Sequence, residues 1–334
     1  MNAFPLPKRL HTDSGNIRRV GVELEFAGLE LDQISRLIIE LFGGHEEQKS
    51  RFERVIRGTR WGDFNTEIDI RLLKDRSYLK FLDKAGVSLD DDAMRQVEDL
   101  LARVASTLVP LEVGTPPIPM DEAHEIERLR ESLQRHHALG TRASIRYAFG
   151  LQFNPEIPAE DINTVLAYLR AFLLLNDWLE QRSQVALTRR VAPFINHFHQ
   201  DYVRSVLAPD YDPTLAELID HYIDHNPTRN RPLDMLPLLR HLDEERVDAR
   251  FAGKDIKIKS RPTFHYRMPN SLIDDPDWTL AFEWAGWVAV DDLAQNRQQI
   301  ARLSESYLAD RSSLAIGYDE AWARQVAAWL DASR

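Results

Sequence analysis

Apolar and polar residues alternate in several short stretches of the chain, which is the pattern of strands that are buried on one face. In residues 20–26 the apolar side chains fall on one side, whereas Glu23 and Glu25 fall on the other. The same period returns in residues 64–71, 109–113, 147–153 and 256–267. We therefore predict five strands, each with a polar face opposite its apolar one.

Between these strands, apolar residues recur at helical spacing. One such stripe covers residues 31–41 and stops at Gly43-Gly44, where a helix end is expected. Further stripes cover residues 94–104 and 124–137, the second of which we interpret as a charged surface helix. Strands interrupted by helices predict an α+β fold with a largely antiparallel sheet and flanking helices.

From Pro158 to about residue 250 the pattern is helical, broken only by prolines, and the carboxyl terminus is helical again. We expect a single catalytic domain over residues 1–334. Residues 158–250 would form a helical insertion in it, and residues 251–334 would return to the core.

Composition and charge exclude several classes of function. The 334 residues include no cysteine, which excludes thiol catalysis, disulfides and cysteine-ligated zinc. Acidic residues outnumber basic ones by 53 to 42, and the net charge of −11 disfavours a nucleic-acid partner because it repels phosphates. The most apolar segment, Val165–Leu179, is interrupted by Arg170 and Asp177 and is too short for a bilayer helix. We expect a cytoplasmic protein with no membrane partner.

The polar faces of the predicted strands carry an unusual set of side chains. If the strands share one sheet, this face holds Glu23, Glu25, Asp69, Glu112, Gln152, Asn154, Lys259 and Arg261. Acids on neighbouring strands repel one another unless a cation lies among them. Hard cations such as Mg²⁺ prefer oxygen ligands of this kind, and lysine and arginine donate to anions. Metals and basic groups around phosphates are typical of phosphoryl transfer.

Structural interpretations compete with this one. A Glu-x-Glu strand such as Glu23–Glu25 is more often an exposed face than a metal site. Lys259 and Arg261 could pair with the acids, which would make the whole cluster structural. His265 lies inside the basic stretch, where it could contact substrate or phosphate, but packed or surface histidines are commoner.

Four motifs follow one another along the chain. They are Gly21–Phe26 (GVELEF), Trp61 with Asp69, Leu111–Pro117 (LEVGTPP) and Lys259–Asn270 (KSRPTFHYRMPN). In order and content they resemble the amidoligase family, part of the carboxylate–amine ligase superfamily with a glutamine-synthetase-like catalytic fold. The resemblance extends from about Gly21 to Asn270, which is most of the chain.

The resemblance implies a concave antiparallel sheet that holds ATP together with Mg²⁺ or Mn²⁺ ions. In such ligases ATP phosphorylates a carboxylate, and an amine then attacks the acyl phosphate to give an amide, ADP and phosphate. The carboxylate and the amine would be small molecules or peptides. No pattern in the sequence identifies either substrate or the oligomeric state.

Roles for individual residues follow from the same resemblance. It implies that Glu23, Glu25 and Glu112 are metal ligands. Arg261, with Lys259 or Arg267, would stabilise the migrating phosphoryl group. Asp69 would hold the incoming amine or join the metal shell.

The chain departs from the family on one strand, which reads Gly150–Glu156 (GLQFNPE) where many members carry histidines. Gln152 can still offer a carbonyl oxygen to a hard cation, and with Asn154 it is expected to help bind the cofactor. The metal preference would differ, or the site would be inactive. Two alternatives therefore stand beside the ligase: a kinase for a small guanidino or carboxylate compound, and an inactive scaffold or binding protein.

Overall fold

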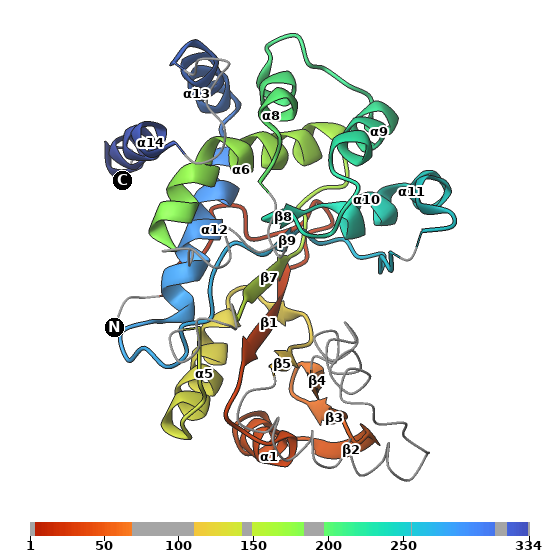
Figure 1. Ribbon diagram of the computed structural model, residues 1–334, viewed down its shortest axis with the longest axis vertical. Coiled ribbons are helices and arrows are strands. Elements are labelled where there is room, and N and C mark those ends of the chain that lie inside the picture. Colours follow the sequence, from red (N-terminus) through yellow and green to blue (C-terminus); the bar gives the residue numbers. More distant parts are fainter. Residues whose placement is uncertain are drawn as a thin grey trace, which may run out of the picture.

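The computed structural model describes residues 4–68, 110–141, 149–183, 197–254, 256–310 and 319–332, which form a sheet with helices packed on one side. Within these residues a nine-stranded sheet runs through the molecule (Figure 1). Its strands are β1 (Arg19–Phe26), β2 (His45–Ser50), β3 (Glu53–Thr59), β4 (Gly62–Ile68), β5 (Leu111–Gly114), β6 (Ile118–Pro119), β7 (Leu151–Pro155), β8 (Leu233–Asp234) and β9 (His265–Tyr266).

The strand pairs of this sheet are antiparallel, and their order is β2-β3-β4-β5-β1-β7-β9-β8. The short β6 pairs with the amino-terminal end of β1. β1 thus lies near the middle of the sheet, with β5 on one side and β7 on the other. The prediction of an α+β fold with a largely antiparallel sheet is confirmed.

Helices cover one side of the sheet and extend beyond its β8–β9 end. In Figure 1, α1, α5, α12 and α6 follow one another along that side, and α8 to α11 gather near β8 and β9. α13 and α14 pack on α6. The helices are α1 (Leu31–Phe42), α5 (Ile126–Arg135), α6 (Ile162–Arg182), α8 (Gln200–Leu207), α9 (Leu215–His225), α10 (Leu236–Leu242), α11 (Glu244–Phe251), α12 (Leu280–Ala294), α13 (Arg297–Asp310) and α14 (Glu320–Ala332).

The alternation in β1 explains how the sheet is oriented. Val22, Leu24 and Phe26 are buried in the same core as the apolar stripe of α1 and the fully buried Trp284 and Trp287 of α12. Because successive side chains of a strand point to opposite faces, the glutamates of β1 face away from this core. The fold therefore leaves the polar side of the central strands open to a ligand.

The last predicted strand, over residues 256–267, is wrong for most of its length, since only His265–Tyr266 forms a strand. The preceding residues are extended, but their backbone groups form hydrogen bonds with α10 and not with a neighbouring strand. Arg240 donates to the carbonyl of Ile258 (2.9 Å), and the N–H of Arg261 donates to the carbonyl of Pro237 (3.1 Å). Pro262 has no N–H to donate to a neighbouring strand.

The β2–β3 hairpin is a part of the sheet that the periodicity did not predict. His45–Ser50 contains no apolar residue and is mostly exposed, so its sequence shows no alternation. Its pairing depends on β3, where Val55 and Ile56 are buried against the core. An edge strand of this kind is polar on both faces and resembles a loop in sequence.

Some predictions fall on parts of the chain outside the described residues. They concern residues 69–71 of the second strand, the helix over 94–104 and the first residues of the strand over 147–153. The division into one domain with an insertion at 158–250 stays a prediction. None of the helices in the described ranges combines the length and the apolar character needed to cross a membrane.

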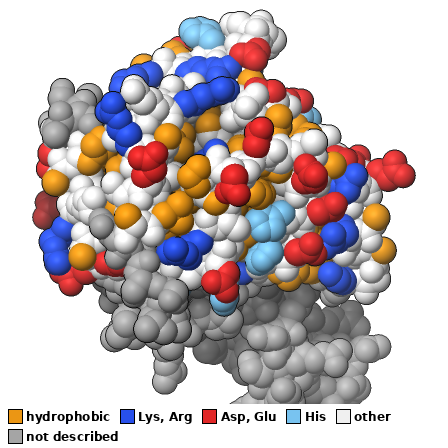
Figure 2. Space-filling view, turned by 90° about the horizontal axis from the view of Figure 1, so that it is seen from above, with side chains coloured by type: hydrophobic (Ala, Val, Ile, Leu, Met, Phe, Trp, Pro, Cys, Tyr) orange, Lys and Arg blue, Asp and Glu red, His pale blue; other side chains and the backbone are white. Residues whose placement is uncertain are grey.

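The end of the molecule around α8, α9 and α13 is chemically mixed. Figure 2, which views the molecule from above, shows acidic, basic, histidine and hydrophobic side chains interspersed over this face. The net negative charge of the chain is therefore not concentrated on this face.

Candidate functional site

A cavity of about 430 Å³ opens on the polar face of the sheet. The side chains around it are segregated by charge, with glutamates on the central strands and lysines and arginines on the segments beyond β7. The acidic half consists of Glu23, Glu25, Glu53, Glu67 and Glu112, and the basic half consists of Arg229, Lys257, Lys259, Arg261 and Arg267.

Four of the glutamates form a row across neighbouring strands, which we call the glutamate row: Glu25, Glu112, Glu67 and Glu53. Glu25 of β1 lies opposite Glu112 of β5, and Glu112 lies opposite Glu67 of β4. Glu67 in turn lies opposite Glu53 of β3. Residues directly opposite in antiparallel strands have Cβ atoms about 4.5–5.5 Å apart, and like charges at that spacing destabilise a sheet. A cation bound along the row would offset this repulsion.

The two glutamates of β1 are oriented by neighbouring segments. The backbone N–H of Gly150 donates to Oε2 of Glu25 (2.6 Å), and Nδ2 of Asn154 donates to Oε1 of Glu23 (2.7 Å). Both glutamates remain half-exposed toward the cavity. The strand β7 and the residue before it thus set the direction of both carboxylates without enclosing them.

In the basic half, Arg229 and Arg267 are held by one buried acid. Nε of Arg229 lies 3.0 Å and Nη2 of Arg267 lies 3.7 Å from Oδ2 of Asp234. Burial raises the pKa of the Asp234 carboxyl, and the charges of Arg267 and Arg229 oppose that shift. Its other oxygen accepts from the N–H of Leu236 (3.1 Å). Asp234 thereby directs two guanidinium groups toward the cavity.

The remaining basic residues come from the extended segment before β9. Ile256 and Ile258 pack against the core, while Lys257, Lys259 and Arg261 are exposed on the cavity side. Across the described ranges, the side chains of Lys259 and Arg261 form no ion pair. These two residues therefore do not form, with the described acids, the salt bridges that a purely structural cluster would require.

A chain of hydrogen bonds joins the acidic half to the basic half. It begins at Asn154, whose NH₂ group donates to Glu23. It continues to Gln152, whose Nε2 lies 2.6 Å from Oδ1 of Asn154. The same Gln152 nitrogen lies 3.1 Å from Nδ1 of His265. Burial, and after it the charges of Arg267 and Arg229, lower the pKa of His265 well below its usual value, which favours the neutral imidazole.

The structure brings most of the predicted site residues into this one cavity. They are Glu23, Glu25, Glu112, Gln152, Asn154, Lys259, Arg261 and Arg267. Asp69 lies outside the described residues. Lys259 and Arg261 reach the cavity from an irregular extended segment and not from a strand of the sheet. The individual roles assigned to these residues stay predictions.

Several cavity residues were not predicted. Glu67 already lay on the polar face of a predicted strand, so the alternation could have included it. Glu53 could not be found because β3 was not predicted. Arg229 comes from a loop, and Asp234, the acid that holds it, comes from a two-residue strand; neither sequence carries a periodic pattern.

The donor set suits a hard divalent cation, since it consists of carboxylate and amide oxygens from adjacent strands. As the side chains stand, no group of three or more acidic or histidine residues in the described part of the chain converges to hold a metal ion. Glutamate side chains in register can converge by rotation alone, without movement of the strands. The residues thus fit Mg²⁺ in their chemistry, and metal binding would have to draw their carboxylates together.

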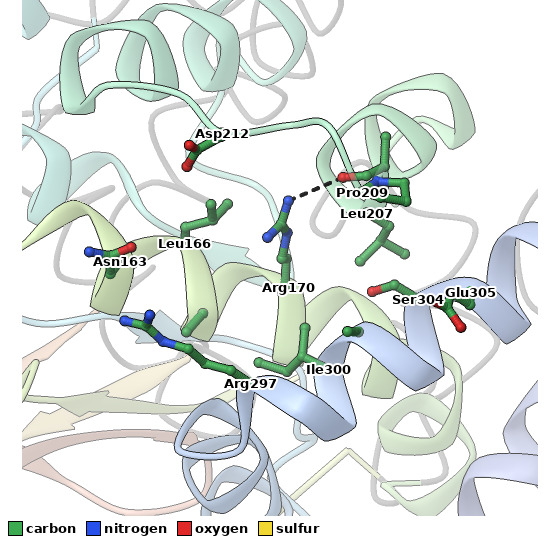
Figure 3. Close-up of a pocket in the computed structure, with 13 residues that line it drawn as sticks. Asn163, Leu166, Arg170, Leu207, Pro209, Asp212, Arg297, Ile300, Ser304 and Glu305 are labelled. Carbon is green, nitrogen blue, oxygen red and sulfur yellow. Dashed lines mark hydrogen bonds between the residues drawn. The ribbon is translucent and has the colours of Figure 1, made fainter.

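A second cavity, of about 260 Å³, lies among α6, α8 and α13 (Figure 3). Arg170 of α6 points across it and donates to the carbonyls of Val206 (2.8 Å) and Tyr211 (2.7 Å). These bonds tie the segment after α8 to α6. Burial lowers the pKa of the Arg170 guanidinium. The lining of this cavity, which includes Ile300 and Ser304, is not divided into an acidic and a basic half. The first cavity is therefore the stronger candidate.

Comparison with known proteins gives one match. A family model described as putative amidoligase enzyme matches residues 16–289, a range that contains every described strand and the whole of the first cavity. Neither a curated protein nor a solved structure matches the chain.

Proposed function

The chain belongs to this amidoligase family, because the family model matches most of its length, and from that premise we propose that it is an ATP-dependent ligase that joins a carboxylate to an amine. The observation that carries the proposal is the single cavity in which five glutamates face five lysines and arginines. Such a division suits a substrate whose phosphates need both metal ions and basic side chains.

On the acidic side, Glu23, Glu25 and Glu112 would hold Mg²⁺ or Mn²⁺. A metal ion held by these residues would supply positive charge that offsets the negative charge developing on the phosphate oxygens of ATP. Asn154 supports this assignment because its NH₂ group orients Glu23, and Gln152 in turn donates to the carbonyl oxygen of Asn154.

On the basic side, Arg261, Lys259 and Arg267 would hold the phosphoryl group during its transfer. Arg261 and Lys259 are exposed at the cavity, and Arg267 is fixed by Asp234. Charge-assisted hydrogen bonds from arginine to phosphate are strong and directional, and they act most where negative charge develops in the transition state.

The reaction would proceed in two balanced steps. An oxygen of the substrate carboxylate attacks the γ-phosphorus of ATP, so that an O–P bond forms and the bond to the leaving ADP breaks. The nitrogen of the amine then attacks the acyl carbon, the C–N bond forms, and the C–O bond to phosphate breaks. The amine must shed protons as it attacks, and a carboxylate beside the metal ligands, such as Glu67, would hold the incoming amine and accept a proton. The resemblance to the family implies the same role for Asp69.

An acyl phosphate can be tested without knowledge of the amine. Hydroxylamine is a small, reactive amine that converts an acyl phosphate to a hydroxamate, which iron(III) reveals by colour. We expect ADP release and hydroxamate formation when the protein, Mg²⁺–ATP and hydroxylamine meet the correct acid from a panel of carboxylic acids and carboxyl-terminal peptides.

The matched control pair is Glu112→Gln in the cavity and Glu40→Gln on the exposed face of α1. Glu112→Gln should abolish both signals, and Glu40→Gln should leave both unchanged. A stable phosphorylated product without hydroxamate would instead identify a kinase. An absence of Mg²⁺–ATP binding in calorimetry would identify a non-enzymatic binding protein.

A further inference from the structure

His265 occupies the boundary between the two halves of the cavity. It lies on β9, which pairs with β7, and its side chain lines the cavity while only 4% of the residue is exposed. Its Nδ1 is engaged by Gln152, but its Nε2 has no hydrogen-bond partner within the described part of the chain. A buried polar atom without a partner is uncommon in folded proteins and needs an explanation, such as a bound water, an ion or a ligand.

The hydrogen-bond chain determines which nitrogen of His265 carries the proton. The carboxylate of Glu23 can only accept, so the group of Asn154 that faces it must be the NH₂. The carbonyl of Asn154 then accepts from the NH₂ of Gln152. That same NH₂ faces Nδ1 of His265, which must therefore be the acceptor, and the proton of the neutral imidazole must be on Nε2.

The opposite end of the network leads to the same tautomer. Nη2 of Arg229 lies 3.5 Å from Nδ1, and a guanidinium has only donors to offer. Two donors therefore point at Nδ1, from the acidic half through Gln152 and from the basic half through Arg229. The Nε2–H group is thus left as a fixed donor that is buried beside the cavity and has no partner among the described residues.

We propose that His265 is a substrate-contacting residue whose Nε2–H donates to an oxygen of the phosphate or acyl-phosphate group held between the glutamates and the arginines. The inference rests on the proposed function for the identity of that group. The charges around His265 select the ligand, because Arg229, Arg261 and Arg267 attract an oxyanion to the cavity that His265 lines. A neutral imidazole at this position donates a hydrogen bond without adding a positive charge next to the metal ions.

Two variants separate contact with the ligand from a purely structural role. His265→Asn can place its amide oxygen near the position of Nδ1, and so keep the bond from Gln152, but it removes the Nε2–H donor. His265→Gln can extend an amide NH₂ to the position of Nε2 and so keep a donor in the cavity. We expect His265→Asn to raise the dissociation constant for Mg²⁺–ADP with inorganic phosphate about tenfold or more, and His265→Gln to stay within about threefold of the parent.

A structural role predicts the reverse, because Asn preserves the bond to Gln152 better than Gln does. Equal affinities in both variants, or tighter binding by His265→Asn than by His265→Gln, would overturn the proposal.

The unmodified protein provides a test that does not depend on the variants. Long-range ¹H–¹⁵N spectra of ¹⁵N-histidine-labelled protein should show His265 as the Nε2–H tautomer, and the Nε2 resonance should move on addition of Mg²⁺–ADP and phosphate. If these ligands bind while that resonance stays in place, the His265 contact is wrong and the ligase proposal stands. If the protein binds neither Mg²⁺–ADP nor phosphate, both proposals fail together.

Discussion

Glu25 and Glu112 lie directly opposite each other on β1 and β5, in the central part of the sheet. Each strand also presents a buried apolar face to the core, with Leu24 and Val113 in the neighbouring register position. The register is therefore set by hydrophobic burial, since a slip of one residue would turn the apolar side chains to the wrong face. The same burial forces the two carboxylates together on the other face.

The first prediction concerns the effect of metal on stability. Mg²⁺ with ADP should raise the midpoint of thermal unfolding of the parent protein, because a ligand that binds only the folded state stabilises it. At about 100 times the dissociation constant this stabilisation amounts to about 2.7 kcal/mol. Glu112→Gln should abolish the increase without lowering the midpoint of the metal-free protein. An increase in midpoint of parental size in Glu112→Gln would show that the metal binds elsewhere.

The second prediction is a gradient along the glutamate row. Glu67 is one strand and Glu53 two strands away from Glu112, and neighbouring strands are about 4.8 Å apart. If the metals lie between Glu25 and Glu112, the effect of a Gln substitution on the dissociation constant for Mg²⁺–ADP should be largest at Glu112, smaller at Glu67 and smallest at Glu53. Calorimetry of the three single variants measures this order. Equal effects at all three positions would indicate a diffuse electrostatic role.

The parts of the fold that could be predicted from the sequence are those where one face is buried. β1 and β5 alternate cleanly because one side packs in the core, and α1 shows its stripe for the same reason. The β2–β3 hairpin could not be predicted because His45–Ser50 lies at an edge with no apolar face. Strand order also depends on long-range pairing, which no local period encodes.

Residues of the candidate site could likewise be predicted where they lie in an alternating strand, and could not be predicted where they lie in a loop. Glu23 and Glu112 could be placed on one face because each lies in an alternating strand. Lys259 and Arg261 line the same cavity as the glutamates although the strand predicted for them is wrong, since extended backbone alternates whether or not it pairs. Arg229 arrives from a loop, and only the fold brings it next to His265.

The third prediction separates function from stability at Arg261. Arg261→Ala should lower ATP turnover by about 100-fold, as expected when a donor to developing negative charge is removed. Its free energy of unfolding should stay within about 0.5 kcal/mol of the parent, because the side chain is exposed. Arg261→Lys should recover only part of the turnover, since lysine lacks the bidentate fork. Arg36→Ala, an exposed arginine on α1, is the control and should behave as the parent.

The fourth prediction concerns the start of α6. Asp161 caps this helix by accepting from the N–H of Thr164 (3.1 Å). Partial burial alone would raise the pKa of Asp161, but the hydrogen bonds from Thr164 outweigh it and lower that pKa. Asp161→Ala should destabilise the protein by about 1 kcal/mol near neutral pH. Because the pKa of the folded state is the lower one, the carboxylate stabilises the fold above its unfolded pKa, and this is lost as the pH falls through the folded pKa.

Urea unfolding at a series of pH values checks the cap. The difference between parent and Asp161→Ala should shrink as the solution becomes acidic. Asp161→Asn, which caps without a charge, should stay close to the parent at neutral pH. A difference that is constant with pH would contradict the role of the carboxylate.

The fifth prediction concerns Asp234, which positions Arg229 and Arg267 but does not itself need to touch the substrate. Asp234→Asn keeps the shape of the side chain but replaces one acceptor oxygen with a donor. Both arginines contact Oδ2, whereas Oδ1 accepts from the N–H of Leu236, so an NH₂ group in place of Oδ2 removes the acceptor of both arginines. Because the acid is fully buried, we expect a loss of about 2 kcal/mol in the free energy of unfolding. The loosened guanidinium groups should raise the KM for ATP more than they lower kcat at saturating ATP, because Arg261 and Lys259 remain in place. An unchanged KM in a folded Asp234→Asn protein would show that Arg229 and Arg267 do not contact the nucleotide.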